Sequence, residues 1–357
     1  MHTKTFVAAA VGLGLLTLSA CGSTDTKGAA DTKTVTLVSH DSWAASKNVI
    51  ADFEKQSGYK LRVLKDGDAG QAVNKAVLTK DNPQGDVFFG VDNTLLSRAL
   101  DNGLFQPYAA KGLGQTDPAF QLDRAKHRVT PVDHGDVCVN YDKAYFDKHG
   151  LKPPRTFADL ADPKYKNLLV TENAATSSPG LGFLLGSAAD YGDKGWEGYW
   201  KKLKANGVKV VDGWEQAYYQ EFSGSSEGKK AGGDRPLVVS YASSPPAEVI
   251  YAKMKPATAP TGVAEGTCFR QIEFAGLLKN AKNPEGGKAF LDFLLSRKFQ
   301  QDMPMNMFVY PVIKNAKVPA EFTKYGPAVK DPQTMAPEKI AANRDQWVSS
   351  WTSLVLK

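Results

Sequence analysis

Apolar and polar residues along the first third of the chain follow two different periods. Short apolar or alternating runs at residues 34–40, 59–65 and 86–92 are typical of strands. Between them, residues 44–58 and 67–85 carry apolar side chains at helical spacing. Strands that alternate with helices in this way favour a parallel sheet built from right-handed crossovers. We therefore expect an α/β unit in this part of the chain.

Two long extended segments divide the rest of the chain. They lie at residues 128–146 and 265–280, and a second α/β series lies between them, from the strand-like residues 168–173 to residues 236–245. Extended segments that bracket a complete α/β unit indicate two lobes joined by crossing strands, with a ligand cleft between the lobes. The expected first lobe comprises 35–137 and 268–315, and the second comprises 138–267 and 316–357, including a C-terminal helix.

The first 34 residues differ from everything after them. Lys4 precedes a short apolar run that closes with Leu-Ser-Ala-Cys at Cys21. This pattern is typical of a secretory signal and is too short for a membrane-spanning helix. Its ending resembles a bacterial lipobox, in which the cysteine becomes lipidated. We expect residues 1–21 to be a lipoprotein signal, residues 22–34 a flexible tether, and the protein to be exported and anchored to the cell membrane through lipid alone.

Charge and cysteine content narrow the class of protein further. The formal net charge is +6, and it falls to +5 when Lys4 is left out. The basic residues are scattered, so the sequence does not support nucleic-acid binding. With Cys21 assigned to lipid, Cys138 and Cys268 form an even pair in an oxidising compartment, which favours a disulfide over two free thiols. Because each lies in one extended segment, a bridge would join the crossing strands and leave the lobes free to close.

Familiar catalytic and metal-binding motifs are missing from the sequence. The histidines show no His-x-x-x-His spacing, and there is no Cys-x-x-Cys pair, Walker loop or Gly-x-Ser-x-Gly elbow. We therefore expect a monomeric binding protein with no enzymatic activity, no cofactor and no metal.

Polar and aromatic residues gather where the strands are expected to end, which is where α/β sheets bind ligands. The candidate ligand-binding residues are Asp41, Ser42, Trp43, Asp68, Asp92, Asn93, Thr176, Ser177, Ser178, Gly180, Trp214, Tyr218, Tyr241, Ser243 and Phe308. Aromatic faces attract cations, and a carboxylate balances the charge, so this set suits a flat, cationic, organic ligand.

Two of these groups have an ordinary structural explanation as well. The Thr-Ser-Ser-Pro-Gly run at 176–180 would present backbone N–H groups to an anion such as phosphate, but a plain helix cap has the same residues. Trp214 and Tyr218 are four residues apart and share one helical face, which a core stripe would also explain.

The order of these motifs resembles that of the thiamine-binding proteins of bacterial ABC importers. The resemblance runs from about Thr34 to the C-terminal helix and is carried by HDSWAAS (40–46), GDAGQAVNKAVLTKDNPQGDVFFGVDN (67–93), TSSPGLGFLL (176–185), DGWEQAYYQEF (212–222), VVSYASSPPAEV (238–249) and FVYPV (308–312). It implies a type II periplasmic-binding fold that captures thiamine, or its mono- or diphosphate, and delivers it to an ABC permease. His40 and Phe308 depart from the family, which has tyrosine and tryptophan there. On this basis we expect Trp43 to form an aromatic wall of the cleft and Asp41 to form a polar anchor.

Other functions stay open at this point. Ferric-iron-binding proteins of related fold use adjacent tyrosines, and Tyr218-Tyr219 is such a pair, although neighbours on an α-helix point about 100° apart. A thiamine-degrading enzyme of related fold would need a reactive cysteine, which Cys138 could supply if it were unpaired. Polyamines explain the Ser-Ser-Pro-Gly loop less well.

Overall fold

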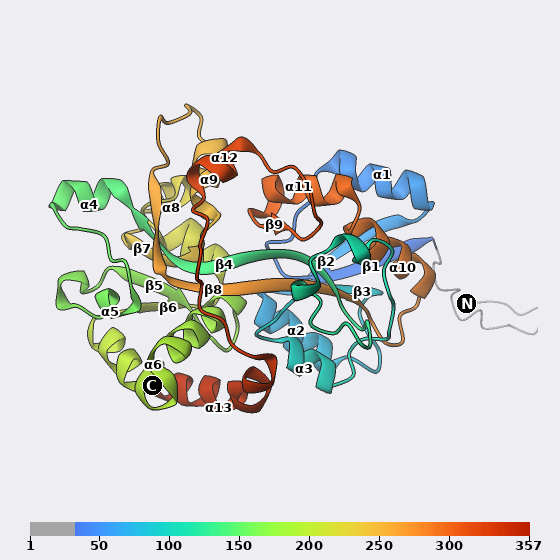
Figure 1. Cartoon of the computed structure of the whole chain (residues 1–357), viewed down its shortest axis with the longest axis horizontal. Coiled ribbons are helices and arrows are strands. Elements are labelled where there is room, and N and C mark those ends of the chain that lie inside the picture. The colour runs from blue at the N-terminus through green and yellow to red at the C-terminus, as the bar shows by residue number, and fades with distance from the viewer. Residues whose placement is uncertain (1–32) are drawn as a thin grey trace, which may run out of the picture. The chain divides into compact units, whose positions relative to one another are not determined.

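In the computed structural model, residues 33–357 are described (Figure 1). The expected signal segment, the lipidation site Cys21 and nearly all of the expected tether lie outside these residues. The described chain forms one nine-stranded sheet with helices around it. The strands are β1 (Thr34–Ser39), β2 (Lys60–Lys65), β3 (Val87–Asp92), β4 (Thr130–Asp142), β5 (Leu169–Glu172), β6 (Lys209–Val211), β7 (Leu237–Tyr241), β8 (Thr261–Leu277) and β9 (Tyr310–Pro311).

The sheet contains two parallel groups joined by antiparallel strands. Its order is β2-β1-β3-β8-β4-β7-β5-β6, and β9 pairs with β4. β1 is parallel to β2 and β3, and β5 is parallel to β6 and β7, which confirms the parallel α/β series expected from the sequence. β8 pairs antiparallel with β3 and β4, and β4 pairs antiparallel with β7. We call the β1–β3 group with its helices lobe 1, and the β5–β7 group with its helices lobe 2.

Helices follow the strands in both lobes. They are α1 (Lys47–Ser57), α2 (Ala69–Leu78), α3 (Leu96–Asp101), α4 (Lys143–His149), α5 (Phe157–Leu160), α6 (Ser178–Ala205), α7 (Trp214–Gln216), α8 (Ser226–Ala231), α9 (Ser244–Ile250), α10 (Pro284–Leu294), α11 (Arg297–Met307), α12 (Ala320–Tyr325) and α13 (Pro337–Val355). Short 3₁₀ turns η1 (Leu113–Gln115), η2 (Pro118–Phe120) and η3 (Pro163–Tyr165) and a π-helical turn η4 (Ala217–Glu221) complete the set. Non-helical backbone at Gly192 kinks α6, at the point where the sequence pattern separates two helices.

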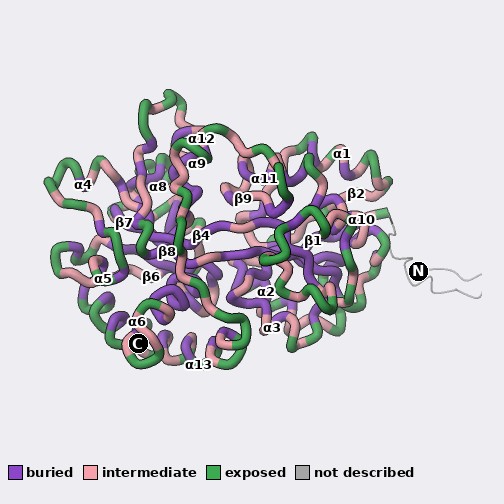
Figure 2. The backbone as a smooth tube through the Cα atoms, in the orientation of Figure 1, coloured by how far each residue is buried: buried purple, intermediate pink, exposed green. Residues whose placement is uncertain are grey.

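The two long extended segments expected from the sequence are β4 and β8, which run side by side across the middle of the sheet (Figure 1). Most of each strand is buried (Figure 2), as expected for strands that pass through both lobes. A disulfide joins Cys138 on β4 to Cys268 on β8, with a Cα–Cα distance of 4.2 Å, and confirms the expected pairing. The expected boundaries at 137/138 and 267/268 fall within these crossing strands, the one at 315/316 lies outside them, and the exact division between the lobes stays a prediction.

Of the two largest apolar clusters, one lies mainly in lobe 1 and the other extends through both lobes. In lobe 1, Val35 and Phe53 pack in one buried cluster with Phe290 of α10, and the two phenylalanine rings meet edge to face. In lobe 2, Trp200 of α6 packs edge to face against Trp351 of α13. The C-terminal helix therefore contacts lobe 2, where the sequence analysis places it, and it also contacts α3 of lobe 1.

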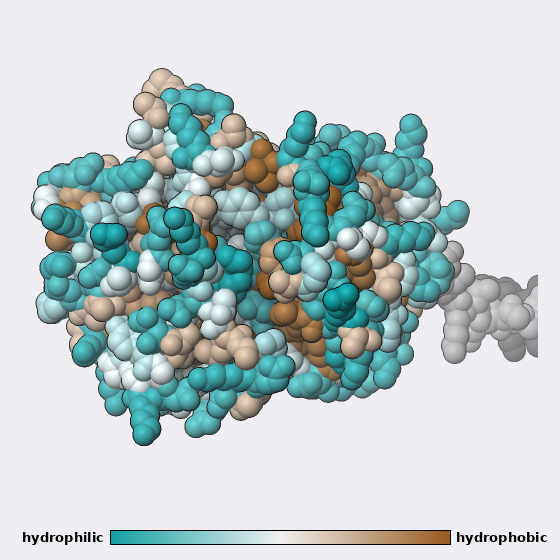
Figure 3. Space-filling view, viewed as in Figure 1, coloured by the Kyte–Doolittle hydropathy of each residue, from teal (hydrophilic) through white to brown (hydrophobic). Residues whose placement is uncertain are grey.

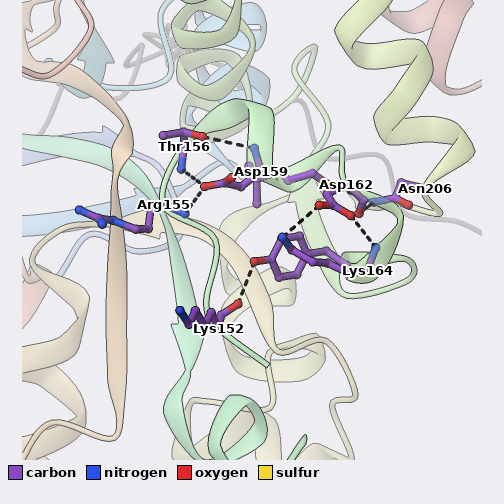
Figure 4. A network of polar contacts seen from close by, with 9 residues as sticks. Lys152, Arg155, Thr156, Asp159, Asp162, Lys164 and Asn206 are labelled. Atoms are coloured by element: carbon purple, nitrogen blue, oxygen red, sulfur yellow. Dashed lines mark hydrogen bonds and ion pairs between the residues drawn. The ribbon is translucent and has the colours of Figure 1, made fainter. Parts of the chain in front are cut away.

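A polar network holds the connection between β4 and β5 on the surface of lobe 2 (Figure 4). Thr156 and Asp159 form a capping box at the start of α5, and Asp162 caps η3. The Asn206 side chain donates to the backbone oxygens of Leu160 and Asp162. These side chains satisfy backbone groups at helix ends, so the network has a structural explanation.

The surface is mainly polar on the face that Figure 3 presents, where hydrophilic side chains extend over both lobes. Along residues 33–357, none of the helices combines the length and the apolar character that crossing a bilayer requires.

Candidate functional site

Two adjoining cavities lie where the lobes meet. The inner cavity measures about 50 Å³ and draws its lining from both lobes and from β8. Its lining residues are His40, Ser42, Asp68, Ala69, Ser178, Pro179, Trp214, Tyr241, Ser244, Gln271, Glu273, Met307, Phe308 and Val309. The outer cavity measures about 360 Å³. It is lined by Trp214, Tyr218, Tyr219, Ser226, Glu227, Ser244, Ala247, Glu248, Tyr251, Asn306 and Phe308.

Asp68 brings the first carboxylate to the inner cavity, and it does so from the N-cap of α2. Its Oδ1 accepts a hydrogen bond from the backbone N–H of Ala69 at 2.6 Å, which satisfies one free donor of the helix. Its Oδ2 accepts from the backbone N–H of Trp214 in lobe 2 at 2.8 Å. Burial raises the pKa of Asp68, and these hydrogen bonds oppose the rise. One side chain therefore caps a helix, joins the lobes and faces the cavity.

Glu273 brings the second carboxylate, from the middle of β8. In the sheet it lies opposite Asp133 of β4, and the two carboxyl groups share a hydrogen bond. His40 Nε2 lies 3.1 Å from Glu273 Oε1. The imidazole fits because Gly90 of β3 has no side chain: a Cβ there would lie 2.4 Å from the ring. Burial raises the pKa of Glu273 to about 8 and lowers that of His40, so both groups tend towards their neutral forms.

A third carboxylate lies directly behind the cavity wall. Asp92, at the end of β3, is fully buried and accepts hydrogen bonds from the Thr94 hydroxyl and two backbone N–H groups. Its second oxygen accepts from Gln271 Nε2 at 2.6 Å, and that amide also lies 3.2 Å from the Ser178 hydroxyl. Asp92 therefore fixes the orientation of Gln271, which lines the cavity.

Two further buried carboxyl groups enlarge the acidic cluster. Burial raises the pKa of Asp133 and of Glu172 well above the ordinary range, and nearby carboxylates raise both further. Glu172, at the end of β5, is 0% exposed and neither of its oxygens has a hydrogen-bond partner. Buried charges are normally paired. The protein therefore holds more acidic groups around this cavity than its own cations balance.

Aromatic rings from lobe 2 also line the inner cavity. The Trp214 ring stacks on Tyr218 with centroids 5.1 Å apart, and its Nε1 donates to Ser240. Tyr241 lies at a tilt 6.4 Å from Trp214. Phe308, from lobe 1, lines both cavities and has a left-handed backbone with φ 57°. A bulky residue in this conformation is uncommon, and such strain is often found at ligand sites.

Direct hydrogen bonds across the cleft show that the lobes are closed. Besides the bond from Trp214 to Asp68, the backbone N–H of Gln71 in α2 donates to the Thr176 oxygen of lobe 2 at 3.0 Å. Gly70 allows this approach, because a Cβ there would lie 2.6 Å from the Thr176 backbone. At the outer cavity, the Tyr251 hydroxyl of lobe 2 donates to the backbone oxygen of Met305 in α11 at 2.5 Å.

The structure brings six of the candidate residues together at the inner cavity: Ser42, Asp68, Ser178, Trp214, Tyr241 and Phe308. Tyr218 lines the outer cavity only. The remaining candidates lie outside both linings: Asp41, Trp43, Asp92, Asn93, Thr176, Ser177, Gly180 and Ser243.

The expected aromatic wall at Trp43 lies elsewhere. Trp43 is 4% exposed and packs in the apolar cluster of lobe 1 with Val49 and Phe299. The turn after β1 directs its indole into the core, while His40 and Ser42 face the cavity. Asp41 accepts from the backbone N–H of Gly67 at 3.1 Å, so its carboxylate ties two loops of lobe 1 together.

Several other candidates have structural contacts of their own. The Asn93 side chain exchanges hydrogen bonds with the β8 backbone at Arg270 and Ile272. Thr176 donates to the Asp212 oxygen, and Gly180 packs against the Glu172 backbone, where a Cβ would lie 2.6 Å away. Ser177 and Ser243 are buried at the starts of α6 and α9.

The adjacent tyrosines Tyr218 and Tyr219 are not arranged as the sequence analysis expects. Tyr218 and Tyr219 lie in the π-helical turn η4, and both line the outer cavity with their rings perpendicular and 5.4 Å apart. The 100° separation of an α-helix therefore does not apply. Tyr218 donates from its hydroxyl to Glu248 at 3.1 Å, and burial raises the pKa of both phenols, that of Tyr219 to about 12. Among residues 33–357, no group of three or more His, Cys, Asp or Glu side chains is placed to hold a metal ion.

Sequence reasoning missed His40, Gln271 and Glu273 as cavity residues. The sequence did contain a signal for Glu273, because Glu273 and Asp133 interrupt the apolar pattern of long buried strands. Ionisable residues are almost never fully buried without a partner or a function. The sequence analysis also did not single out the outer-cavity residues Glu227, Glu248 and Tyr251.

Comparison with known proteins agrees with this geometry. Residues 82–329 match the family described as bacterial extracellular solute-binding protein. The thiamine-binding periplasmic protein of Salmonella typhimurium is 30% identical over 328 residues, which cover 90% of this chain and 93% of that protein. A solved periplasmic thiamin binding protein superposes with a TM-score of 0.76 at 27% identity, covering 90% of this chain and 96% of its own. The ferric binding protein from Campylobacter jejuni, at 18% identity and a TM-score of 0.70 over 90% of this chain and 99% of its own, shares the fold. The fold is thus the two-lobed type II periplasmic-binding fold that the sequence predicts.

Proposed function

The chain belongs to the bacterial extracellular solute-binding protein family, and we propose that it captures thiamine in the two adjoining cavities between its lobes. The observation that carries the proposal is the cluster of buried carboxyl groups, led by Asp68 and Glu273, that lines the same cavity as the Trp214 and Tyr241 rings. Thiamine is a flat aromatic cation with a ring amino group. Its positive charge would balance the cluster, and the amino group would donate to a carboxylate.

The aromatic residues supply the second part of recognition. A cation over a desolvated aromatic face gains about 0.5–2 kcal/mol. Trp214, Tyr241 and Phe308 offer such faces in the inner cavity, and Ser42, Ser178 and Gln271 offer hydrogen bonds that fix orientation. We assign binding roles to these residues and to Asp68 and Glu273. Asp41, Trp43 and Asn93 support the site by holding loops and strands in place.

Capture follows from closure of the lobes. A ligand that touches both lobes stabilises the closed form by the difference in its affinity for the closed and open forms. The hydrogen bonds from Trp214 to Asp68 and from Gln71 to Thr176 form only when the lobes meet, so they stabilise the closed form with or without ligand. The closed protein would then dock on an ABC permease as a monomer and release thiamine to it.

The relatives are periplasmic binding proteins, and such proteins act outside the cytoplasm. For this chain we propose anchoring to the membrane through lipid at Cys21 and a tether over residues 22–34, as the sequence pattern suggests. The relatives are binding proteins rather than enzymes, and the disulfide leaves Cys138 without the free thiol that a thiamine-degrading enzyme would need.

The test is a titration with thiamine of protein that has been unfolded, dialysed and refolded to remove bound ligand. Tryptophan fluorescence and calorimetry should both give saturable binding of one thiamine per chain, because Trp214 lines the cavity. Absence of binding, together with a red-brown absorption band on addition of ferric citrate, would instead favour iron held by Tyr218 and Tyr219.

A further inference from the structure

Another cavity lies between the lobes, apart from the two that form the proposed thiamine site. It measures about 260 Å³, and its lining comes from α2 and α3 of lobe 1 and from α6 and α13 of lobe 2. α13 contacts both α6 and α3, so it connects the lobes at this point (Figure 1). The lining shares no residue with the inner or the outer cavity. We call it the α13 cavity, and a ligand in it would contact both lobes.

Two arginines, one from each lobe, bring positive charge to the α13 cavity. Arg98 comes from α3 and Arg344 from α13, and both line the cavity. Asp345 is the one carboxylate of the lining, and its side chain is 77% exposed, so water screens its charge. The inner and outer cavities are the reverse, because within the described chain they are lined by carboxylates and by neither lysine nor arginine. The α13 cavity therefore suits a ligand of the opposite charge to thiamine.

Both guanidinium groups have hydrogen-bonding capacity that the described chain leaves unused. Arg344 is 6% exposed, and its Nε and Nη2 both donate to Asp345 Oδ1, at 3.0 and 2.6 Å. Its Nη1 is buried and has no hydrogen-bond partner among residues 33–357, and the same holds for Arg98 Nε. A buried donor without a partner is costly, above all on a charged group. An acceptor bound between the two arginines would remove that cost.

The other lining residues of the α13 cavity favour a small oxyanion. Guanidinium groups bind phosphate and carboxylate oxygens through charge-assisted hydrogen bonds, often in pairs. Asn74 and Ser349 add an amide and a hydroxyl that can donate to the same anion. Leu95, Leu181 and Val348 complete the lining with apolar side chains, and a less polar wall strengthens hydrogen bonds to a charged group.

We propose that the α13 cavity is a binding site for a small oxyanion, a phosphate or a carboxylate, held by Arg98 and Arg344. Small rotations of these long side chains bring their unpaired N–H groups to the anion. The anion then lies between two positive charges and contacts α3 and α13 together. This site is separate from the thiamine site, and its occupancy does not depend on what the cleft binds.

The experiment titrates the protein with inorganic phosphate and, separately, with succinate, in a calorimeter at constant ionic strength set with chloride. Excess thiamine is present throughout, so that the cleft is occupied and the heat reports binding elsewhere. We expect one anion per chain, with a Kd of about 1 mM or lower for at least one of the two probes. Arg98→Gln should weaken that binding about tenfold or more, because it removes a charged donor. Arg98 is only half-buried, and a thermal melt checks the fold of the variant.

A matched control removes the same charge elsewhere in the chain. Arg124 is exposed between η2 and β4 and lines none of the three cavities, so Arg124→Gln should leave anion binding unchanged. Binding of phosphate alone or of succinate alone would support the site and identify the class of oxyanion that it takes. No saturable binding of either probe up to about 10 mM would overturn the inference. Binding that Arg98→Gln leaves unchanged, or that Arg124→Gln weakens equally, would overturn it as well.

Discussion

The two cavities share Trp214, Ser244 and Phe308, yet they differ in chemistry. The inner cavity is small, and both carboxyl groups and aromatic rings line it. The outer cavity is larger, has more aromatic rings and carries carboxylates that already have partners within lobe 2. Charge recognition is therefore concentrated in the inner cavity, where desolvation makes an ion pair strong. The outer cavity contributes aromatic surface for stacking.

The largest loss of thiamine affinity is expected when one carboxylate of the inner cavity is removed. Asp68→Asn keeps a good N-cap residue for α2 but removes the carboxylate that faces the ligand. Loss of one partner of a buried charge pair costs about 2–5 kcal/mol, so thiamine affinity should fall roughly 30-fold or more. Calorimetry measures the change, and a loss below about threefold would place the cation elsewhere.

The next largest effect is the pH dependence of thiamine affinity, which we expect Glu273 of the inner cavity to cause. Burial raises the pKa of Glu273 to about 8 in the empty cavity, and a bound cation favours its ionised form. Binding therefore releases a proton, and affinity should rise by up to about tenfold per pH unit between pH 6 and 8. The facing groups are Asp133, Asp92 and Asp68, all with raised pKa, and His40, whose pKa is lowered, so His40 stays neutral in this window.

Glu273→Gln should flatten that pH dependence. A steep dependence that survives in this variant would assign the proton to another group. The same carboxyl has a folded-state pKa above its ordinary value, so it stabilises the ligand-free protein below about pH 4.5 and loses that contribution as the pH rises towards 8. Thermal melts of the ligand-free protein from pH 5 to 8 should show that decline, and Glu273→Gln should reduce it.

A smaller effect is expected for the ring that the cavities share. Trp214→Ala removes one aromatic face and should weaken thiamine binding by about 0.5–2 kcal/mol. Trp43→Phe is the matched control, because Trp43 packs in the core of lobe 1 and lines neither cavity. It should lower the melting temperature with little change in thiamine affinity. A marked loss of thiamine affinity in Trp43→Phe with an unchanged melting temperature would instead show that Trp43 forms a wall of the cleft.

The smallest effect concerns the edge of the outer cavity. Tyr251→Phe keeps the ring against Phe308 and removes the hydrogen bond from the hydroxyl to Met305 across the lobes. One such bond contributes about 0.5–1.5 kcal/mol, so the closed state should open more readily and thiamine should dissociate a few times faster. Stopped-flow release with excess competitor measures that rate, and an unchanged rate would show that this bond does not hold the lobes closed.

The periodicity of the sequence was enough to predict the two lobes. Each parallel group shows alternating strand and helix patterns, and β4 and β8 stand out as long extended segments. The pairing of Cys138 with Cys268 followed from their number and their places in those segments. These features depend on local pattern, which a single sequence records well.

The acidic cluster depended on information that local pattern does not carry. Asp133 meets Glu273 only because of the register between β4 and β8, which joins residues 140 positions apart. The direction of Trp43 is likewise decided by the turn after β1, which places Trp43 in the core and Ser42 at the cavity. The π-helical turn that directs Tyr218 and Tyr219 to one cavity is likewise set by tertiary packing.

The most direct test of cation recognition compares thiamine with a neutral analogue in which carbon replaces the positively charged thiazolium nitrogen. Shape and stacking area are nearly the same, so the difference in affinity reports the charge. Calorimetric titration of the refolded protein at pH 7.5 should give at least roughly 30-fold weaker binding of the analogue, as expected when buried carboxylates lose their counter-ion. Equal affinities for the two compounds would contradict the account.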